Sequence, residues 1–352
     1  MSPVLRQPEI TGTRDTSGQC NPRLSVVIPC FNEEESLSEL YKRVAAVCRE
    51  VADASFEIVL VDDGSTDSTW AGICGLSAAH TNAVGVKLSR NHGHQLALSA
   101  GLSVARGELI LIIDADLQDP PELLPQMIRL VIDQGAEVVY GQRTVRHGES
   151  ALKRGTAALF YRLLDALTDV QIPVDTGDFR LMTRRALNVL ISMPEQHRFI
   201  RGMVSWIGFK QLPIPYERRE RFAGETKYPF SKMLKLAIDA LTSFSTRPLR
   251  LASFFGFGFA IAGLAGLVYT LGSWLRGYAV PGWTSMTSIF LLMGSAQMFV
   301  LGIIGEYLGR LYMEAKDRPL YIIETVVREA ESASIAQRPP AAPVPQIDRA
   351  RA

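Results

Sequence analysis

The chain has 352 residues, which is long enough for one domain of roughly two hundred residues and a second structural unit. Its formal net charge of +1 gives no general electrostatic argument for binding nucleic acid. The four cysteines form no CxxC pair and no zinc-ligand spacing with histidine, so we expect reduced, structural thiols rather than a metal site.

A polar leader precedes a long region in which strand and helix patterns alternate. Residues 1–22 are rich in Pro, Gly, Thr and Ser, which predicts a disordered leader. The alternation that follows predicts a doubly wound α/β domain with a parallel sheet, spanning residues 23–228. The expected strands are 24–28, 56–62, 83–89 and 109–113, and the expected helices between them are 36–52, 67–79 and 95–105.

Two of the helix starts carry capping signals. Asn32, with Glu35 three residues later, forms a capping box before the first helix. Asp119 precedes Pro120, which predicts that Asp119 caps the helix after the fourth strand, with proline at its first position.

Acidic motifs end two of the apolar runs. Asp62 and Asp63 end the second predicted strand, and Asp114-Ala115-Asp116 ends the fourth. Ligands bind at the carboxyl ends of parallel strands, and side chains two apart on extended chain point the same way, so Asp114 and Asp116 could hold one cation. Such oxygen ligands suit Mg²⁺ or Mn²⁺ carrying a diphosphate. The alternative is that these residues are only helix caps and turn residues.

Common nucleotide-binding loops are missing from the sequence. The turn at residues 29–33 contains no GxGxxG motif, and no GxxxxGK[ST] motif occurs anywhere. Dinucleotide oxidoreductases and P-loop NTPases are therefore disfavoured. A nucleotide could still bind through Asp62 or Asp63, with a metal at Asp116 for its diphosphate. His92 and His94 are not assigned as a metal pair, because no third soft ligand is evident.

The composition changes sharply near residue 250. Residues 251–275 and 277–305 carry no charge and are divided only by Arg276. We therefore expect a hairpin of two transmembrane helices at 249–312, with a buried soluble hairpin as the alternative. The positive-inside rule predicts that both termini and the domain at 23–228 face the cytoplasm, because the flanking basic residues outnumber Arg276; they are Arg247, Arg250, Arg310, Lys316 and Arg318.

Three further segments complete the predicted organisation. Residues 229–248 have an apolar stripe that fits either an interfacial amphipathic helix or packing against the domain. Residues 313–328 are expected to be a cytosolic juxtamembrane segment, and 329–352 a disordered tail.

Four motifs in order carry a family resemblance. They are VVIPCFNEE at 26–34, VDDGSTD at 61–67, NHGHQ at 91–95 and DADLQDPP at 114–121. Together they resemble family 2 glycosyltransferases of the GT-A fold, and most closely the polyisoprenyl-phosphate glycosyltransferases, the dolichol-phosphate mannose synthase and bactoprenol glucosyltransferase group. The similarity runs from about Leu24 to Glu324. It implies a Rossmann-like, mostly parallel sheet with helices on both faces, interfacial helices and two C-terminal transmembrane helices.

The resemblance also implies roles for individual residues. Asp178 is expected at the catalytic centre, with Asp175 as a rival for its role and Asp116 beside the diphosphate. Arg143 and Arg154 would bind the lipid phosphate, and Asp114, Asp116 and Gln118, alternating along the strand end, would face Mg²⁺ or Mn²⁺. The nucleotide-sugar would contact Pro29, Phe31, Glu33, Asp62, Asp63, Asp114, Arg201, Arg221 and Lys227.

The predicted function is a membrane-anchored inverting transferase. It would move a sugar from a UDP- or GDP-sugar donor to a polyisoprenyl phosphate acceptor, at the bacterial inner membrane. A processive polysaccharide synthase and a non-catalytic scaffold or flippase partner are the alternatives. Membrane lipids are expected partners and nucleic acid is not, a flippase is a candidate partner, and the pair Gly305 and Gly309 favours a homo-oligomer.

Overall fold

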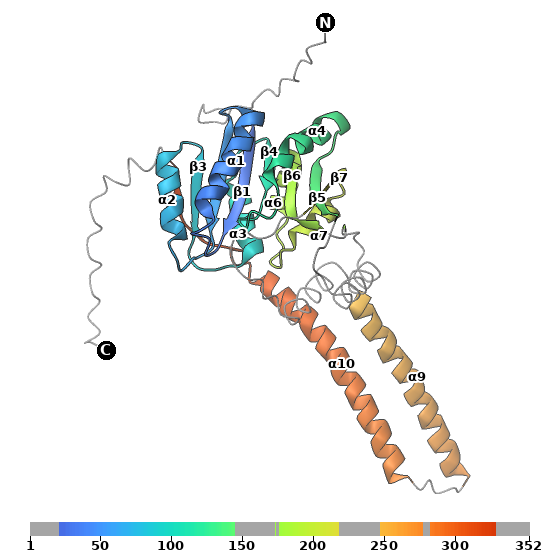
Figure 1. Cartoon of the computed structure of the whole chain (residues 1–352). Coiled ribbons are helices and arrows are strands. Elements are labelled where there is room, and N and C mark those ends of the chain that lie inside the picture. The colour runs from blue at the N-terminus through green and yellow to red at the C-terminus, as the bar shows by residue number, and fades with distance from the viewer. Residues whose placement is uncertain (1–20, 145–172, 174–175, 218–246, 277–281, 329–352) are drawn as a thin grey trace, which may run out of the picture.

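The computed structural model describes residues 21–144, 173, 176–217, 247–276 and 282–328 (Figure 1). The expected leader, interfacial segment and tail lie wholly or mostly outside the described residues. So do four predicted site residues: Arg154, Asp175, Arg221 and Lys227.

One eight-stranded sheet forms the centre of the domain, in the order β7-β5-β6-β4-β1-β2-β3-β8. Strands β4, β1, β2 and β3 pair in parallel, as expected, and β5 pairs in parallel with β7. Strand β6 is antiparallel to both of its neighbours, and β8 is antiparallel to β3, so the sheet is mixed. The strands are β1 Leu24–Cys30, β2 Phe56–Asp62, β3 Ala83–Leu88, β4 Leu109–Ile112, β5 Val138–Arg143, β6 Thr176–Thr183, β7 Gln211–Tyr216 and β8 Ile323–Val327.

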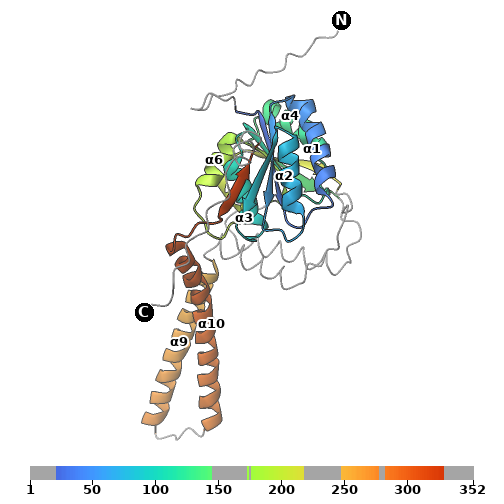
Figure 2. The same ribbon diagram turned by 90° about the vertical axis from the view of Figure 1, so that its left-hand side faces the viewer.

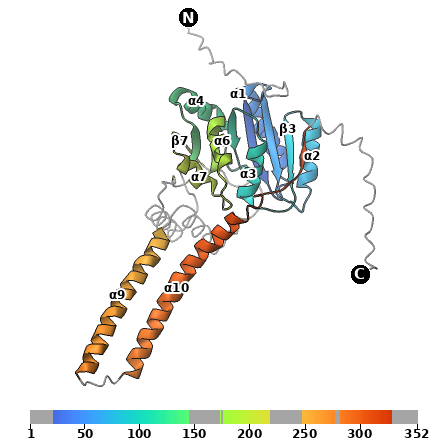
Figure 3. The ribbon, with the colours of Figure 1, turned by 180° about the vertical axis from the view of Figure 1, so that it is seen from behind.

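Helices cover both faces of the sheet. Figure 2 shows α1 and α2 on one side and α3 and α6 on the other, and Figure 3 shows the face with α3, α6 and α7. Neighbouring residues of β1 point to opposite faces, as the strand period requires: Val26 and Ile28 pack with α1 and α4, and Val27 packs with α3. These helices are α1 Leu37–Ala52, α2 Thr69–Ala79, α3 His94–Val104, α4 Leu124–Gln134, α6 Arg184–Ser192 and α7 Ile200–Ile207.

Both predicted caps are wrong. Asn32 has a φ of 56° and its Oδ1 accepts a hydrogen bond from the amide of Thr66 at 2.9 Å, so it fastens the loop after β2 instead of capping α1. Helix α1 follows Ser36, which makes no side-chain cap. Asp119 is fully buried and accepts a hydrogen bond from the hydroxyl of Tyr216, so a tertiary contact takes the carboxylate that the local pattern assigned to a helix end.

Two long helices extend away from the domain side by side: α9 (Arg247–Leu275) and α10 (Trp283–Ala315) (Figure 1). Among the described residues, the stretch Leu292–Ala315 is long and apolar enough to cross a membrane, and α9 contains a shorter apolar stretch, Gly256–Gly266. Large apolar side chains on both helices are exposed, including Phe257 and Phe290.

The chain returns from α10 to the domain. The segment predicted to be cytosolic and juxtamembrane, 313–328, completes α10 and then supplies β8, the red edge strand in Figure 2. The carbonyl of Ile322 accepts a hydrogen bond from the amide of Ser89, at the carboxyl end of β3. At the other end of β8, Arg328 Nη1 lies 3.3 Å from the buried carboxylate of Glu57. The sheet is therefore built from segments on both sides of the helical hairpin.

Candidate active site

A pocket of about 270 Å³ lies at the carboxyl ends of the parallel strands. It brings together six of the residues predicted to bind the donor or a metal, although they come from three separate segments. Phe31 is 46% exposed at this pocket, which leaves its ring available to a ligand. The pocket is lined by Pro29, Cys30, Phe31, Glu33, Asp63, Asn91, Gly93, His94, Ala97, Asp114, Ala115 and Asp116.

Asp114 and Asp116 both face this pocket, but not in the way predicted. Strand β4 ends at Ile112, and a turn at residues 115 and 116 leads to Leu117, whose φ is 58°. The acidic residues therefore sit on a turn and do not alternate along a strand. Gln118 is buried, and its amide donates to Asp116 Oδ1 at 3.1 Å, so its backbone orients that carboxylate.

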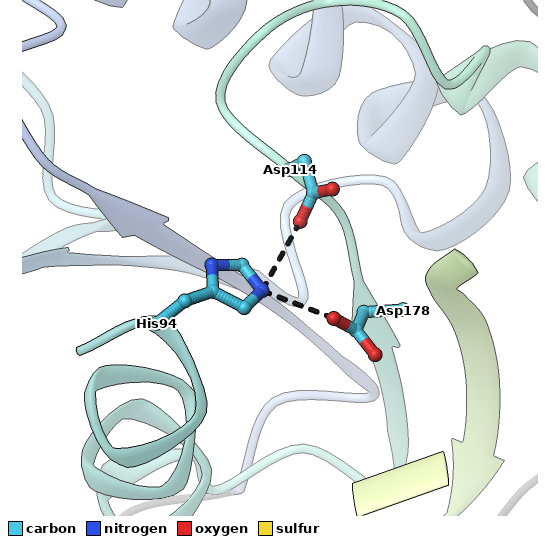
Figure 4. Close-up of side chains that lie close together, drawn as sticks. All are labelled: His94, Asp114 and Asp178. Carbon is cyan, nitrogen blue, oxygen red and sulfur yellow. Dashed lines mark hydrogen bonds and ion pairs between the residues drawn. The ribbon is translucent and has the colours of Figure 1, made fainter. Parts of the chain in front are cut away.

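Asp178, on β6, is the centre of a charged cluster. Its carboxylate is almost completely buried and accepts hydrogen bonds from Arg201 Nε at 2.8 Å and from Gln95 Nε2 at 3.1 Å. The ring of His94 completes the cluster, with Nε2 lying 3.1 Å from Asp178 and 3.5 Å from Asp114 (Figure 4). Because a carboxylate accepts and cannot donate when ionised, Nε2 carries a proton in this arrangement, and it would have to lose that proton to bind a cation.

The two aspartates of this cluster titrate in opposite directions. Burial opposes ionisation of Asp178, but Arg201 and His94 outweigh it and hold the pKa of Asp178 well below its usual range. Burial, together with the nearby charge of Asp178, raises the pKa of Asp114 to about 6. Asp178 is therefore a permanent anion that organises its donors, and Asp114 is the carboxylate that gains most from an added cation.

A fully buried arginine supports the Asp178 backbone from within the sheet. Arg180 Nε donates to the carbonyl of Asp178 at 3.3 Å, and its Nη2 donates to the carbonyl of Gly177 at 3.0 Å. Burial lowers the pKa of Arg180 to about 10, although Asp178 opposes the shift. The guanidinium therefore stays charged at neutral pH and fixes the position of the strand that carries the cluster.

Asp62 and Asp63, at the end of β2, make different contacts. Asp63 is buried and accepts hydrogen bonds from the amides of His92 at 2.7 Å and Gly93 at 2.9 Å, so it shapes the loop before α3. Asp62 accepts from the amide of Ser65 through Oδ1 at 3.2 Å, while its Oδ2 is buried without a hydrogen-bond partner in the described part of the chain. Such an oxygen favours a ligand that brings a donor.

Two of the basic residues predicted for the site, Arg143 and Arg201, lie among the described residues. Arg143 ends β5, and its Nη2 lies against the backbone of Gly177, next to Asp178. Arg201 holds Asp178 from α7.

Three residues of the site had no role in the sequence analysis. His94, Gln95 and Arg180 surround Asp178, and Gln95 Oε1 also accepts from the amide of Ile200 at the start of α7. The motif at 91–95 contains His94 and Gln95, but its local sequence does not indicate which strand these side chains contact. His94 and Asp178 are 84 residues apart in the chain.

Two carboxylates and one imidazole, of which Asp114 and His94 line the pocket, form a group that fits a divalent cation. Asp114, Asp178 and His94 each offer a ligand atom, and these atoms lie within 4.8 Å of one another. Asp114 Oδ1 is buried without a hydrogen-bond partner among the described residues. Asp116 lines the same pocket outside this group. Oxygen and imidazole donors of this kind suit Mn²⁺ and Mg²⁺.

Comparison with known proteins places both parts of the chain. The family described as glycosyl transferase family 2 matches residues 25–191, and the family described as GtrB C-terminal hairpin matches residues 247–311. An uncharacterized glycosyltransferase of Bacillus subtilis, YkcC, is 46% identical over 85% of this chain and 93% of its own. A prophage bactoprenol glucosyl transferase homolog of Escherichia coli is 40% identical, covering 86% and 99%. The bactoprenol glucosyl transferase of Shigella phage SfII is 38% identical, covering 86% and 97%.

Proposed function

Since the chain belongs to glycosyl transferase family 2, we propose that it transfers a sugar from a nucleoside diphosphate sugar to a polyisoprenyl phosphate at a membrane surface. The observation that carries this proposal is the position of the acidic pocket. The pocket lies at the carboxyl ends of the parallel strands. The chain returns from the hairpin to the same end of the sheet, where the carbonyl of Ile322 accepts a hydrogen bond from the amide of Ser89. Relatives named bactoprenol glucosyl transferase, similar over nearly their whole length, support a polyisoprenyl phosphate as the acceptor.

The donor would bind along the carboxyl ends of β1 and β2. Pro29, Phe31 and Glu33 form the apolar and polar wall for the base and ribose. The buried Asp62 Oδ2 would accept a hydrogen bond from the base or a ribose hydroxyl, which would satisfy its desolvated charge. Asp63 would act indirectly, through the loop that it holds.

Asp114, Asp116 and Gln118 are proposed to hold Mg²⁺ or Mn²⁺ with the donor diphosphate, and His94 adds a candidate ligand. The bound ion would neutralise charge that develops on the leaving nucleoside diphosphate. Binding a cation would also compensate the two neighbouring negative charges of Asp114 and Asp178.

The residues around Asp178 favour a single displacement without a general base on this aspartate. A phosphate monoester is already an anionic nucleophile near neutral pH, so it needs positioning more than deprotonation. Asp178 is a poor proton acceptor because its pKa is low and its oxygens already accept from Arg201, His94 and Gln95. We propose that it orients these donors, and that Arg143 binds the acceptor phosphate. Arg154, Asp175, Arg221 and Lys227 remain proposed contacts from outside the described residues.

The hairpin would anchor the enzyme in the membrane. Helix α9 leaves the domain and the segment after α10 rejoins its sheet, which supports two spans with the domain and both flanks on one side. The excess of basic residues beside the domain supports the cytoplasmic side of a bacterial inner membrane. A homo-oligomer and a flippase partner remain predictions of the sequence.

The proposal is tested by sugar transfer from a panel of radiolabelled UDP- and GDP-sugars to undecaprenyl phosphate, with Mn²⁺ or with EDTA. We expect one donor to give an organic-phase product that EDTA abolishes. Asp116→Asn should reduce this product strongly, while Asp133→Asn, a change of an exposed carboxylate on α4, should not. Binding of nucleotide without any lipid product would contradict the acceptor assignment, and absence of nucleotide binding would contradict the enzyme assignment.

A further inference from the structure

A chain of polar contacts leads from the buried interior to Arg143. Arg143 and Tyr216 are register partners at the carboxyl ends of the parallel strands β5 and β7. Arg143 Nε donates to the hydroxyl of Tyr216 at 3.4 Å, and that hydroxyl donates to Asp119 Oδ1. Asp119 is fully buried and Tyr216 is 5% exposed, so the chain runs from the core outward.

The direction of these hydrogen bonds follows from the donors and acceptors when Asp119 is ionised. A guanidinium donates and never accepts, and an ionised carboxylate accepts and never donates. The hydroxyl of Tyr216 must therefore give its proton to Asp119 and offer its oxygen to Arg143. Burial, followed by the charge of Asp119, raises the pKa of Tyr216, so the hydroxyl keeps its proton. A hydroxyl that donates to an anion also becomes a better acceptor for a cation.

Neighbouring residues restrict the position of the Tyr216 ring and of its backbone. Phe179 packs against it edge to face, with ring centroids 5.7 Å apart. A side chain at position 141 would come within 2.8 Å of Tyr216 Cε1, so Gly141 leaves room for this ring. Thr144 donates to the carbonyl of Tyr216 through both its amide, at 3.0 Å, and its hydroxyl, at 3.2 Å.

The other end of the Arg143 guanidinium, at Nη2, lies next to β6, the strand that carries Asp178. A Cβ at position 177 would lie 2.8 Å from Arg143 Nη2, so Gly177 leaves room for this close approach. The next residue is Asp178, the centre of the charged cluster. The hydrogen bond from Nε to Tyr216 restricts the orientation of the guanidinium beside Gly177, and a restricted guanidinium suits bidentate phosphate recognition.

We propose that Asp119 and Tyr216 are positioning residues, which hold Arg143 beside Gly177 and Asp178 so that its guanidinium receives the phosphate of the acceptor lipid. The inference rests on the proposed function, because it concerns the acceptor of that reaction. The competing interpretation is that Asp119 and Tyr216 only fasten the turn after β4 to β7, with no effect specific to the acceptor.

The test is a double-mutant cycle on the full-length protein in lipid nanodiscs, using Tyr216→Phe, Arg143→Ala and the double variant. The Michaelis constants for undecaprenyl phosphate and for the productive sugar nucleotide are measured separately. Tyr216→Phe removes only the hydroxyl and keeps the ring that packs against Phe179. Tyr41→Phe is the matched control, since it removes a buried hydroxyl bonded to Asn82 at 2.8 Å, away from the site.

We expect Tyr216→Phe to raise KM for undecaprenyl phosphate about fivefold or more, with KM for the donor changed less than twofold. Asp119→Asn should act in the same direction. The double variant should be no worse than Arg143→Ala alone, because the hydroxyl acts only through that arginine. Tyr41→Phe should leave both constants unchanged.

Additive effects of Tyr216→Phe and Arg143→Ala, equal changes in both Michaelis constants, or no change at all would overturn the inference while leaving the proposed function intact. A wild type that transfers no sugar to undecaprenyl phosphate from any donor would overturn the proposed function and the inference together. If Asp119→Asn does not fold, the Tyr216→Phe cycle still decides between the two interpretations.

Discussion

Replacement of Asp178 by asparagine tests whether its charge organises the site. The side chain keeps its shape but loses the charge that holds Arg201 and His94. Removing one partner of a buried ion pair costs about 3–5 kcal/mol. Arg201 is 29% exposed and His94 44% exposed, so water replaces part of what they lose. We therefore expect Asp178→Asn to lower the free energy of unfolding by about 2 kcal/mol.

This loss can be measured as a shift in melting temperature. For a domain of this size, about 2 kcal/mol corresponds to a decrease of roughly 4–8 °C. The assay is thermal unfolding of the detergent-solubilised protein, followed by intrinsic tryptophan fluorescence, with Asp133→Asn as the control. If Asp178→Asn also destabilises the transition state by about 2 kcal/mol, kcat/KM falls about thirtyfold.

The sign of the pH dependence gives a second check on the same residue. The pKa of Asp178 is lower in the folded protein than in the unfolded chain, so its stabilising effect is present above the unfolded value and disappears only as the pH falls through the folded value. The difference in stability between wild type and Asp178→Asn should therefore persist from pH 8 to pH 5. An unchanged melting temperature, or a difference that vanishes in this range, would refute the described ion pairs.

Three further predictions concern the pocket, the strand beside it and the edge of the sheet. Because the pKa of Asp114 is about 6, Mn²⁺ must displace a proton from this carboxyl at pH 5. The affinity of the protein for Mn²⁺ should therefore fall by up to about tenfold per pH unit below pH 6, and calorimetry in two buffers should detect the released proton. Equal affinity for Mn²⁺ at pH 5 and pH 8 would contradict this prediction. Gly177→Ala should displace the flexible end of Arg143 and raise KM for the acceptor with little change in melting temperature, whereas a large loss of stability would show that the strand moves instead. Arg328→Ala leaves Glu57 buried beside β8 and should cost about 1–3 kcal/mol in chemical denaturation; Arg328→Lys should recover part of that loss.

The first half of the fold could be predicted because its signals are local. Strands β1 to β4 are apolar runs and α1 has a helical period, so the alternation of strands and helices follows from the sequence. Strand β7 contains Pro213 and Pro215, which argue against a strand, and it exists because an edge strand does not need every amide. The sequence patterns also give no sign that β8 would cross back to pair with β3, because that pairing joins segments more than two hundred residues apart in the chain.

The candidate site was predictable in composition but not in geometry. The carboxyl end of β4 was the correct place for Asp114 and Asp116, because parallel strands present their ends at one edge. The turn at Leu117, with its positive φ, changed how they face the pocket, and no propensity rule favours leucine in that conformation. The cap predicted at Asp119 was wrong and the contact of His94 with Asp178 was missed for a different reason, since their partners lie on strands that meet them only in the folded chain.

The return of the chain to form β8 has a consequence for biosynthesis. The ribosome makes β3 long before β8, and the whole hairpin is made between them, so the edge of β3 stays unpaired while α9 and α10 are being synthesised. An open strand edge invites pairing with other chains. The sheet is therefore completed only after the whole hairpin has been synthesised. A chain that stops before Arg247 would be a domain with an exposed edge rather than a soluble form of the enzyme.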